Sequence, residues 1–185
     1  MKRKDFQSTP HPLRHNTMRL KFLWCYICLI QIPFIGRKSK LMIWKDFVTW
    51  CRWLEKEPSI KTFIFLFSER PEFRSVVYYR LKNKFRILPL IFLKGQSSCH
   101  ISANKAESGI ILIHGFSSII NCKSLGKNCT FFQQVTVGYS KGGIPTLGND
   151  CVVCCGAKIL GNTHIGNHVI IGANAVVYMM FQIIQ

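Results

Sequence analysis

From about residue 113 onward, a large apolar side chain recurs at every sixth position of the chain. A period of six fits neither a helix, which returns about every 3.6 residues, nor a strand, which alternates by about two. It is typical of coils of three short strands, which stack because no single coil buries its own apolar face. We therefore predict a mainly β fold, a parallel β-helix of hexapeptide repeats. The repeating positions are Ile113, Ile119, Leu125, Phe131, Val137, Leu147, Val153, Ile159, Ile165, Ile171 and Val177.

The repeat is interrupted once, between Val137 and Leu147, which lie ten positions apart where six are expected. The segment 139–146 contains two adjacent glycines and a proline, which suit a protruding loop better than a strand. Loops on a rigid scaffold often carry binding and catalytic groups, so this loop is a candidate part of a site. A neutral insertion is the alternative.

The N-terminal half has a different composition. Residues 1–94 hold 20 of the 25 lysines and arginines and carry a net charge of +14, against +3 for residues 95–185. Aromatic residues at helical spacing predict two to four helices there, with Pro58 and Pro71 near helix starts. Residues 1–17 are polar and unpatterned, and we predict a disordered extension. The expected organisation is this extension, a basic α-helical region over 18–94, and the β-helix over 95–177.

The formal net charge of +17 would attract polyanions. The sequence contains no recognisable nucleic-acid-binding motif, so nucleic acid is not an expected partner. The apolar run from Phe22 to Ile35 contains Pro33 and has only 14 residues, which is too short to cross a bilayer. We expect a cytoplasmic protein, with loose peripheral contact between the basic half and a membrane surface as a minority hypothesis.

Nine cysteines raise the alternatives of a metal site or disulfides. Cys129 and Cys151 stand four places after a large repeat residue, in the small position that Ala157 fills one repeat later. Cys154 and Cys155 have no second pair at the spacing of a zinc site. Packing is therefore the favoured interpretation, no metal is expected, and so many free thiols fit a reducing cytoplasm.

His114 is the candidate catalytic residue. It directly follows Ile113 and lies upstream of the predicted loop. An imidazole can accept a proton from a hydroxyl near neutral pH, which is the task of a general base. An ordinary surface histidine is an equally open alternative. His164 and His168 fall outside the inward positions and are expected to be exposed turn residues.

Four strings in the second half are distinctive: GIILIHG (109–115), QQVTVG (133–138), GAKILGN (156–162) and IGANAVV (171–177). Together they resemble the serine acetyltransferase family of hexapeptide-repeat acyltransferases. The resemblance implies a left-handed β-helix, acetyl-CoA as co-substrate, and a homotrimer with active sites at the subunit seams. It also implies direct acetyl transfer to a hydroxyl, with His114 as the general base. The residues implied in cofactor binding are Gly138, Gly156, Ala157, Gly172 and Ala173.

The resemblance is incomplete around the acceptor. The family carries an Asp directly before the catalytic His, another Asp 15 residues before it, and an Arg-His pair after the glycine-rich loop. Here these places hold Ile113, Cys99 and Gly143-Ile144. The small-molecule acceptor therefore stays open between serine, as in cysteine biosynthesis, and a sugar hydroxyl in surface polysaccharide synthesis. Residues 178–185 also depart from the family pattern. We predict an aberrant, frameshifted tail, which leaves a truncated inactive copy or a scaffold as a third alternative.

Overall fold

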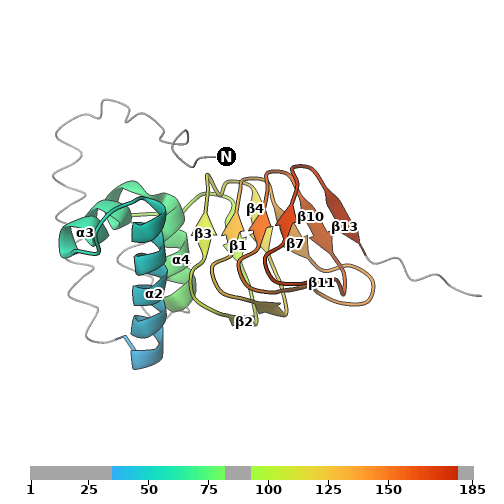
Figure 1. The fold of residues 1–185 in the computed structure, drawn as a ribbon, viewed down its shortest axis with the longest axis horizontal. Helices are drawn as coiled ribbons and strands as arrows, with labels where there is room; N and C mark the ends of the chain where they lie inside the picture. The colour runs from blue at the N-terminus through green and yellow to red at the C-terminus, as the bar shows by residue number, and fades with distance from the viewer. Residues whose placement is uncertain (1–34, 82–92, 179–185) are drawn as a thin grey trace, which may run out of the picture.

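The structure is a computed structural model of the 185-residue chain and describes residues 35–81 and 93–178. The disordered extension predicted for 1–17, almost all of the apolar run 22–35, and the tail after Tyr178 lie outside these ranges. The described residues form three helices followed by a parallel β-helix, and the helices pack on one end of it (Figure 1). Within the described ranges, no helix is long and apolar enough to cross a membrane.

The helices are α2 (Arg37–Trp53), α3 (Ile60–Glu69) and α4 (Pro71–Leu81). The Ser59 hydroxyl caps α3 by accepting a hydrogen bond from the Thr62 N–H at 3.1 Å. Helix α4 begins at Pro71, as predicted, where the missing N–H of proline costs no helical hydrogen bond. Aromatic rings from all three helices meet between them and form a small core. Its rings are those of Phe47, Trp50, Phe63, Phe67 and Phe73.

Between residues 93 and 178, thirteen short strands wind into stacked coils and form three parallel sheets, as the period of six predicted. In order, the first sheet is β1-β4-β7-β10-β13, the second β2-β5-β8-β11 and the third β3-β6-β9-β12. The strands are β1 (Cys99–Ile101), β2 (Lys105–Ala106), β3 (Ile111–Leu112), β4 (Ser118–Ile120), β5 (Ser124–Leu125), β6 (Thr130–Phe131), β7 (Thr136–Gly138), β8 (Thr146–Leu147), β9 (Val152–Val153), β10 (Lys158–Leu160), β11 (His164–Ile165), β12 (Ile170–Ile171) and β13 (Val176–Tyr178).

The register confirms the predicted loop. Lys158 of β10 pairs with Thr136 of β7 on one side and with Val176 of β13 on the other. The first pair is 22 positions apart and the second 18, so four residues leave the coil between β7 and β8 without disturbing the pairing. The inward side chains of these coils, such as Phe131, Val137 and Ile159, are fully buried.

The predicted phase is wrong on both sides of the turn between β3 and β4, where the first coil leads into the second. Ile119 is 47% exposed, and Ile120 points inward instead. Ile113 is buried against the helices rather than inside the coils, where Leu112 takes its place. The physical reason is a longer turn. The inward positions 112 and 120 lie eight apart, whereas 131 and 137, or 153 and 159, lie six apart.

A buried ion pair fixes the helices to the first coil. The carboxylate of Asp46, in α2, accepts hydrogen bonds from Arg80 Nε at 2.7 Å and from the backbone N–H groups of Gly109 at 2.6 Å and Ile110 at 3.3 Å. Arg80 also donates to the carbonyl of Glu107 at 2.6 Å. With these partners a fully buried carboxylate is stable, because each of its oxygens is hydrogen-bonded.

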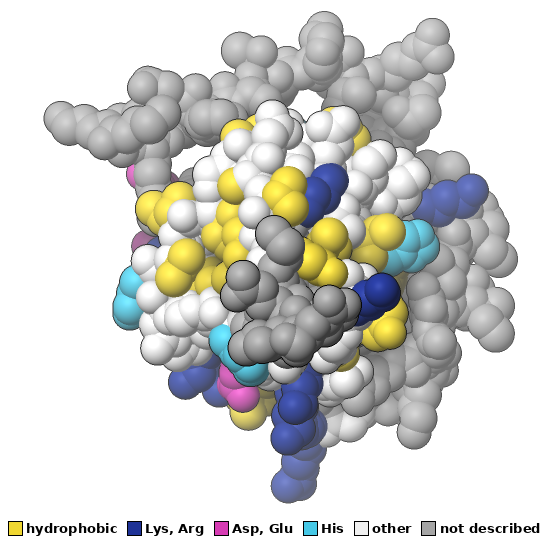
Figure 2. All heavy atoms as spheres, turned by 90° about the vertical axis from the view of Figure 1, so that its right-hand side faces the viewer, with side chains coloured by type: hydrophobic (Ala, Val, Ile, Leu, Met, Phe, Trp, Pro, Cys, Tyr) yellow, Lys and Arg dark blue, Asp and Glu magenta, His cyan; other side chains and the backbone are white. Residues whose placement is uncertain are grey.

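The opposite end of the β-helix has a different surface. There the last described coil exposes the side chains of Ile170 (72%) and Val176 (67%). Figure 2 views this end and shows hydrophobic side chains gathered on it. The helices therefore cover the apolar surface at one end of the stack of coils. At the other end, the apolar side chains of Ile170 and Val176 are exposed.

Candidate active site

His114 stands in the long turn between β3 and β4, residues 113–117, which we call the His114 corner. Its φ of 58° is in the left-handed region, as is that of Ser117 at 51°. Two such residues turn the chain sharply, and the N–H of Phe116 donates to the carbonyl of His114. The His114 side chain is exposed and forms no hydrogen bond or ion pair with any described residue. The imidazole is therefore free to bind an incoming hydroxyl.

The corners of successive coils stack on the His114 corner and form one edge of the β-helix, the His114 edge. The Gln134 N–H donates to the Phe116 carbonyl at 3.0 Å, and the Gly156 N–H to the Gln133 carbonyl at 3.0 Å. In the last coil, the Asn174 N–H donates to the Cys155 carbonyl at 2.9 Å. Through these bonds the structure aligns the His114 corner with the turns that carry Gly156, Ala157, Gly172 and Ala173.

Two of the residues expected to bind the cofactor are open to solvent on this edge. Gly172 and Ala173 are exposed, and a Cβ built on Gly172 would meet no atom within 4 Å. The other two expected residues on this edge, Gly156 and Ala157, are explained by the fold itself. Gly156 has a φ of +72°, and a Cβ on it would lie 2.0 Å from Asn174 Oδ1, so the turn itself requires glycine there. Ala157 is fully buried in the core.

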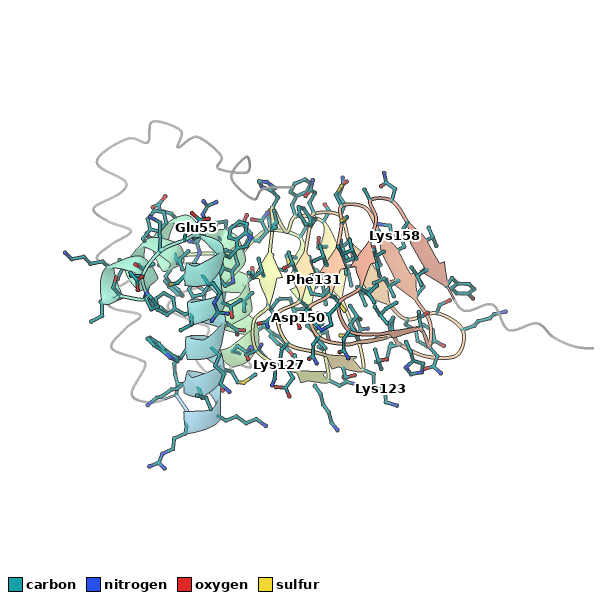
Figure 3. All side chains as sticks on the ribbon, in the orientation of Figure 1. Glu55, Lys123, Lys127, Phe131, Asp150 and Lys158 are labelled. Carbon is teal, nitrogen blue, oxygen red and sulfur yellow. The ribbon has the colours of Figure 1, made fainter. Side chains whose placement is uncertain are left out.

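Gly138 and the loop 139–145 lie on the other edge of the first sheet, the loop edge, because β7 runs from one edge to the other. Figure 3 shows Lys123, near the loop edge, on the opposite side of the β-helix from Lys158. Ser140 and Gly143 close the loop with paired backbone hydrogen bonds of 3.1 and 3.0 Å. One chain therefore does not bring His114 and the loop together.

The buried thiols are poor nucleophiles at neutral pH. Burial raises the pKa of Cys122 to about 11 and that of Cys129 to about 12. Burial, and secondarily the charge of Glu72, raise the pKa of Cys99 to about 11. Only the thiolate attacks or binds metal well, so these side chains are suited to packing. No group of three or more potential metal ligands occurs among the described residues.

The two downstream histidines differ from one another. His168 is a turn residue, as expected, with a φ of 57° and a side chain 77% exposed. His164 is exposed but belongs to strand β11, so the predicted turn is wrong for it. Its Nδ1 lies 2.7 Å from the Thr146 hydroxyl on the neighbouring strand β8. Neither residue lies in a corner of the His114 edge.

Sequence reasoning missed Glu72 as a neighbour of His114. A Cβ built on Gly115 would lie 3.7 Å from Glu72 Cγ and 3.6 Å from Gln96 Cγ. The sequence placed Glu72 only at the start of a helix. The Pro-Glu-Phe-Arg string at 71–74 did indicate the start of that helix. The orientation of Glu72 toward the His114 corner depends on how the helix docks.

Comparison with known proteins agrees with this architecture. Residues 145–178 match the bacterial transferase hexapeptide (six repeats) family. A serine acetyltransferase of Synechococcus elongatus is 30% identical over 138 residues, which cover 66% of this chain and 56% of that protein. The resemblance to the serine acetyltransferases is confirmed. A serine acetyltransferase of Helicobacter pylori is 40% identical over 78 residues, or 40% of this chain and 46% of that protein. The chain thus spans about half the length of these relatives.

Solved structures of serine acetyltransferases share the fold. Serine acetyltransferase 1 of Entamoeba histolytica superimposes with a TM-score of 0.58 at 22% identity, covering 85% of this chain and 69% of that one. The enzyme of Neisseria gonorrhoeae gives a TM-score of 0.55 at 22% identity, covering 77% and 59%. At this level of identity the likeness establishes the arrangement of helices and β-helix.

Proposed function

We propose that this chain is an O-acetyltransferase that transfers the acetyl group of acetyl-CoA to the hydroxyl of a small acceptor, with serine as the first candidate. The observation that carries the proposal is the exposed imidazole of His114, which forms no hydrogen bond or ion pair with any described residue and stands in the lengthened corner between β3 and β4. The names of the relatives support the same reaction.

In this mechanism His114 acts as general base. Its imidazole takes the proton of the acceptor hydroxyl as the hydroxyl oxygen forms a bond to the acetyl carbonyl carbon. The imidazolium then returns that proton to the sulfur as the carbon–sulfur bond breaks. Acetyl-CoA supplies the acetyl group as a thioester, and no acyl-enzyme forms. General base catalysis of this kind contributes about 10²- to 10⁴-fold to a rate.

We place the acetyl-CoA site on the His114 edge. Gly172 and Ala173 leave the backbone there open, and a pantetheine arm needs such close approach. Lys158 projects from β10 near this edge, and its Nζ donates to the Gln134 carbonyl at 2.8 Å in this structure. Turned outward, its ammonium group would pair with a phosphate of the cofactor.

The separation of His114 and the loop supports an assembly of several copies, and we propose the homotrimer that the family resemblance implies. Because they lie on opposite edges of one chain, a site that contains both needs the loop of a second copy. Rotational symmetry would then repeat the same seam around the assembly. Sedimentation analysis tests the oligomeric state, and a monomer at working concentration would contradict the proposal.

Mixed assemblies test the shared site more directly. Deletion of 140–143 restores the regular spacing of the repeat, and His114→Ala removes the base. Each variant alone is expected to lose most of its activity. Co-expressed, they should recover part of the activity, because some seams then join an intact His114 to an intact loop. Absence of recovery, with both variants in one assembly, would place the loop outside the site.

A sugar hydroxyl is the second candidate acceptor. Cys99 and Ile113 stand where the family has carboxylates, and Ile113 is buried against the helices. Neither can bind an amino acid's charged group or orient the imidazole. A neutral sugar has no ammonium or carboxylate group and does not need such partners.

The experiment that tests the function measures free CoA thiol released from acetyl-CoA by the purified protein, with L-serine and with a panel of sugars. Replacement His114→Ala should lower the rate by about 10²- to 10⁴-fold. The matched control is His168→Ala, an exposed histidine in another corner, which should retain full activity. Release without any acceptor dependence, or unchanged release in His114→Ala, would sink the proposal.

A further inference from the structure

Glu72 lies beside the His114 corner although it comes from the helical region. It is the second residue of α4, which packs on strands β1 and β3 of the first coil (Figure 1). The N–H of Gln96 donates to the Pro71 carbonyl at 3.0 Å, which fixes the chain between α4 and β1 against the helix start. Glu72 and Gln96 therefore line the side of this corner next to Gly115.

The Glu72 carboxylate is half-buried and has no partner. Among the described residues it forms no hydrogen bond and no ion pair, including with His114. A carboxylate partly removed from water is costly unless a donor compensates it. The carboxylate is thus free to bind a ligand rather than committed to orienting the imidazole.

The charge of Glu72 also reaches the position that departs from the family pattern. Cys99 is the first residue of β1, on the His114 edge, and Glu72 acts electrostatically on its thiol. Two other acidic side chains lie elsewhere: Asp46 is buried under the helices, and Asp150 stands in another corner. Glu72 is a carboxylate whose side chain borders Gly115 in the His114 corner.

We propose that Glu72 binds the ammonium group of a small amino-alcohol acceptor whose hydroxyl lies against His114. The inference rests on the proposed acetyl transfer, and it selects serine-like acceptors over sugars. An ammonium group has three N–H donors, and no described residue donates a hydrogen bond to the Glu72 carboxylate. Charge-assisted hydrogen bonds between the two groups would be strong. The carboxylate absent at position 99 is replaced by one from the helical region.

A purely structural role for Glu72 makes a different prediction. An acidic residue in the first turn of a helix interacts favourably with the helix dipole. Loss of that interaction would destabilise α4 and would affect all acceptors alike. Two acceptors of the same shape that differ only in the ammonium group separate the two roles.

The test compares L-serine with L-glycerate, which has a hydroxyl where serine has its ammonium group. Binding of each is measured by titration calorimetry, and acetyl transfer to each by thiol release. Glu72→Gln keeps the shape of the side chain and removes its charge. We expect it to weaken serine binding and raise the KM for serine by about ten-fold or more. The KM for acetyl-CoA, the affinity for glycerate and the melting temperature should stay the same.

Two further variants complete the experiment. Glu72→Asp should keep part of the preference for serine, because the charge is retained. Glu107→Gln removes an exposed carboxylate elsewhere in the first coil and should change nothing. Equal serine binding by the wild type and Glu72→Gln would overturn the inference, as would no serine binding by the wild type or an equal loss for both acceptors. Serine binding that depends on Glu72 without any acetyl transfer would leave the inference standing and reject the proposed function.

Discussion

The first coil of the β-helix and the coils after it share the same sheets but differ along one edge. In the later coils the turns of this edge are short, each with one residue at positive φ: Gln134, Gly156 or Asn174. In the first coil the inward positions lie two residues further apart, His114 and Ser117 both have positive φ, and an imidazole is exposed. The difference teaches that the regular repeat supplies a rigid scaffold, while the candidate chemistry lies where the repeat is broken.

The two regions also differ in what stabilises them. The later coils stabilise one another: the Asn149 N–H donates to Asn167 Oδ1 at 2.7 Å, and the Lys127 N–H donates to Asn149 Oδ1 at 2.8 Å. The first coil contacts another coil on one side only, and the helices pack on its other side. Its shape therefore depends on the buried ion pair of Asp46 and Arg80, which joins it to the helices.

The largest effect on stability is expected from Asp46→Ala. The change leaves the guanidinium of Arg80 and two backbone N–H groups buried without their partner, and breaking such a pair costs about 3–5 kcal/mol. Urea unfolding measures the loss. The control is Asp150→Ala, whose carboxylate is 41% exposed, and it should cost less than about 1 kcal/mol. Similar losses in both variants would contradict the dependence of the first coil on the helices.

A second comparison tests the register of β4, directly after the long turn that ends the first coil. Ile120 is fully buried, so Ile120→Ala should lower the free energy of unfolding by about 2–5 kcal/mol. Ile119→Ala should lower it by less than about 0.5 kcal/mol, because that side chain is 47% exposed. The six-residue period alone predicts the reverse. A larger loss in the free energy of unfolding for Ile119→Ala than for Ile120→Ala would contradict the long turn at the His114 corner.

The smallest effect concerns two glycines of the His114 edge. Gly156→Ala places a side chain at positive φ and against Asn174, which should cost about 1–3 kcal/mol. Gly172→Ala enters open space and should change stability by less than about 0.5 kcal/mol. If Gly172 lies along the cofactor, the same change raises the KM for acetyl-CoA. Thermal unfolding and the thiol assay together give both quantities, and equal stability of the two variants would refute the steric explanation.

The sequence could predict the β-helix but not the phase of its first coil. Leu112-Ile113 and Ile119-Ile120 are both aliphatic pairs, so a period of six fits whichever member of each pair is chosen. The choice depends on the length of the turn between them, which contains no proline or adjacent glycines. The loop after Val137 was predictable, because there the pattern itself is displaced.

The candidate site was predictable only in part. His114 could be singled out because the residues around it resemble a known family. Glu72 could not, since it is more than forty positions away and reaches the corner only when α4 docks on β1 and β3. Position 99 signalled that a carboxylate was missing, but only the tertiary structure indicates which residue replaces it.

The contacts of Asp46 have a consequence for the order of folding. They join residues 63 and 64 positions apart, and the helical partner is the one synthesised first. A lone coil has unpaired strand edges and nothing to stack on. Docked helices offer the first coil an apolar surface and a carboxylate for its amides as it leaves the ribosome. We expect the β-helix to grow from its helical end, coil by coil, in the direction of translation.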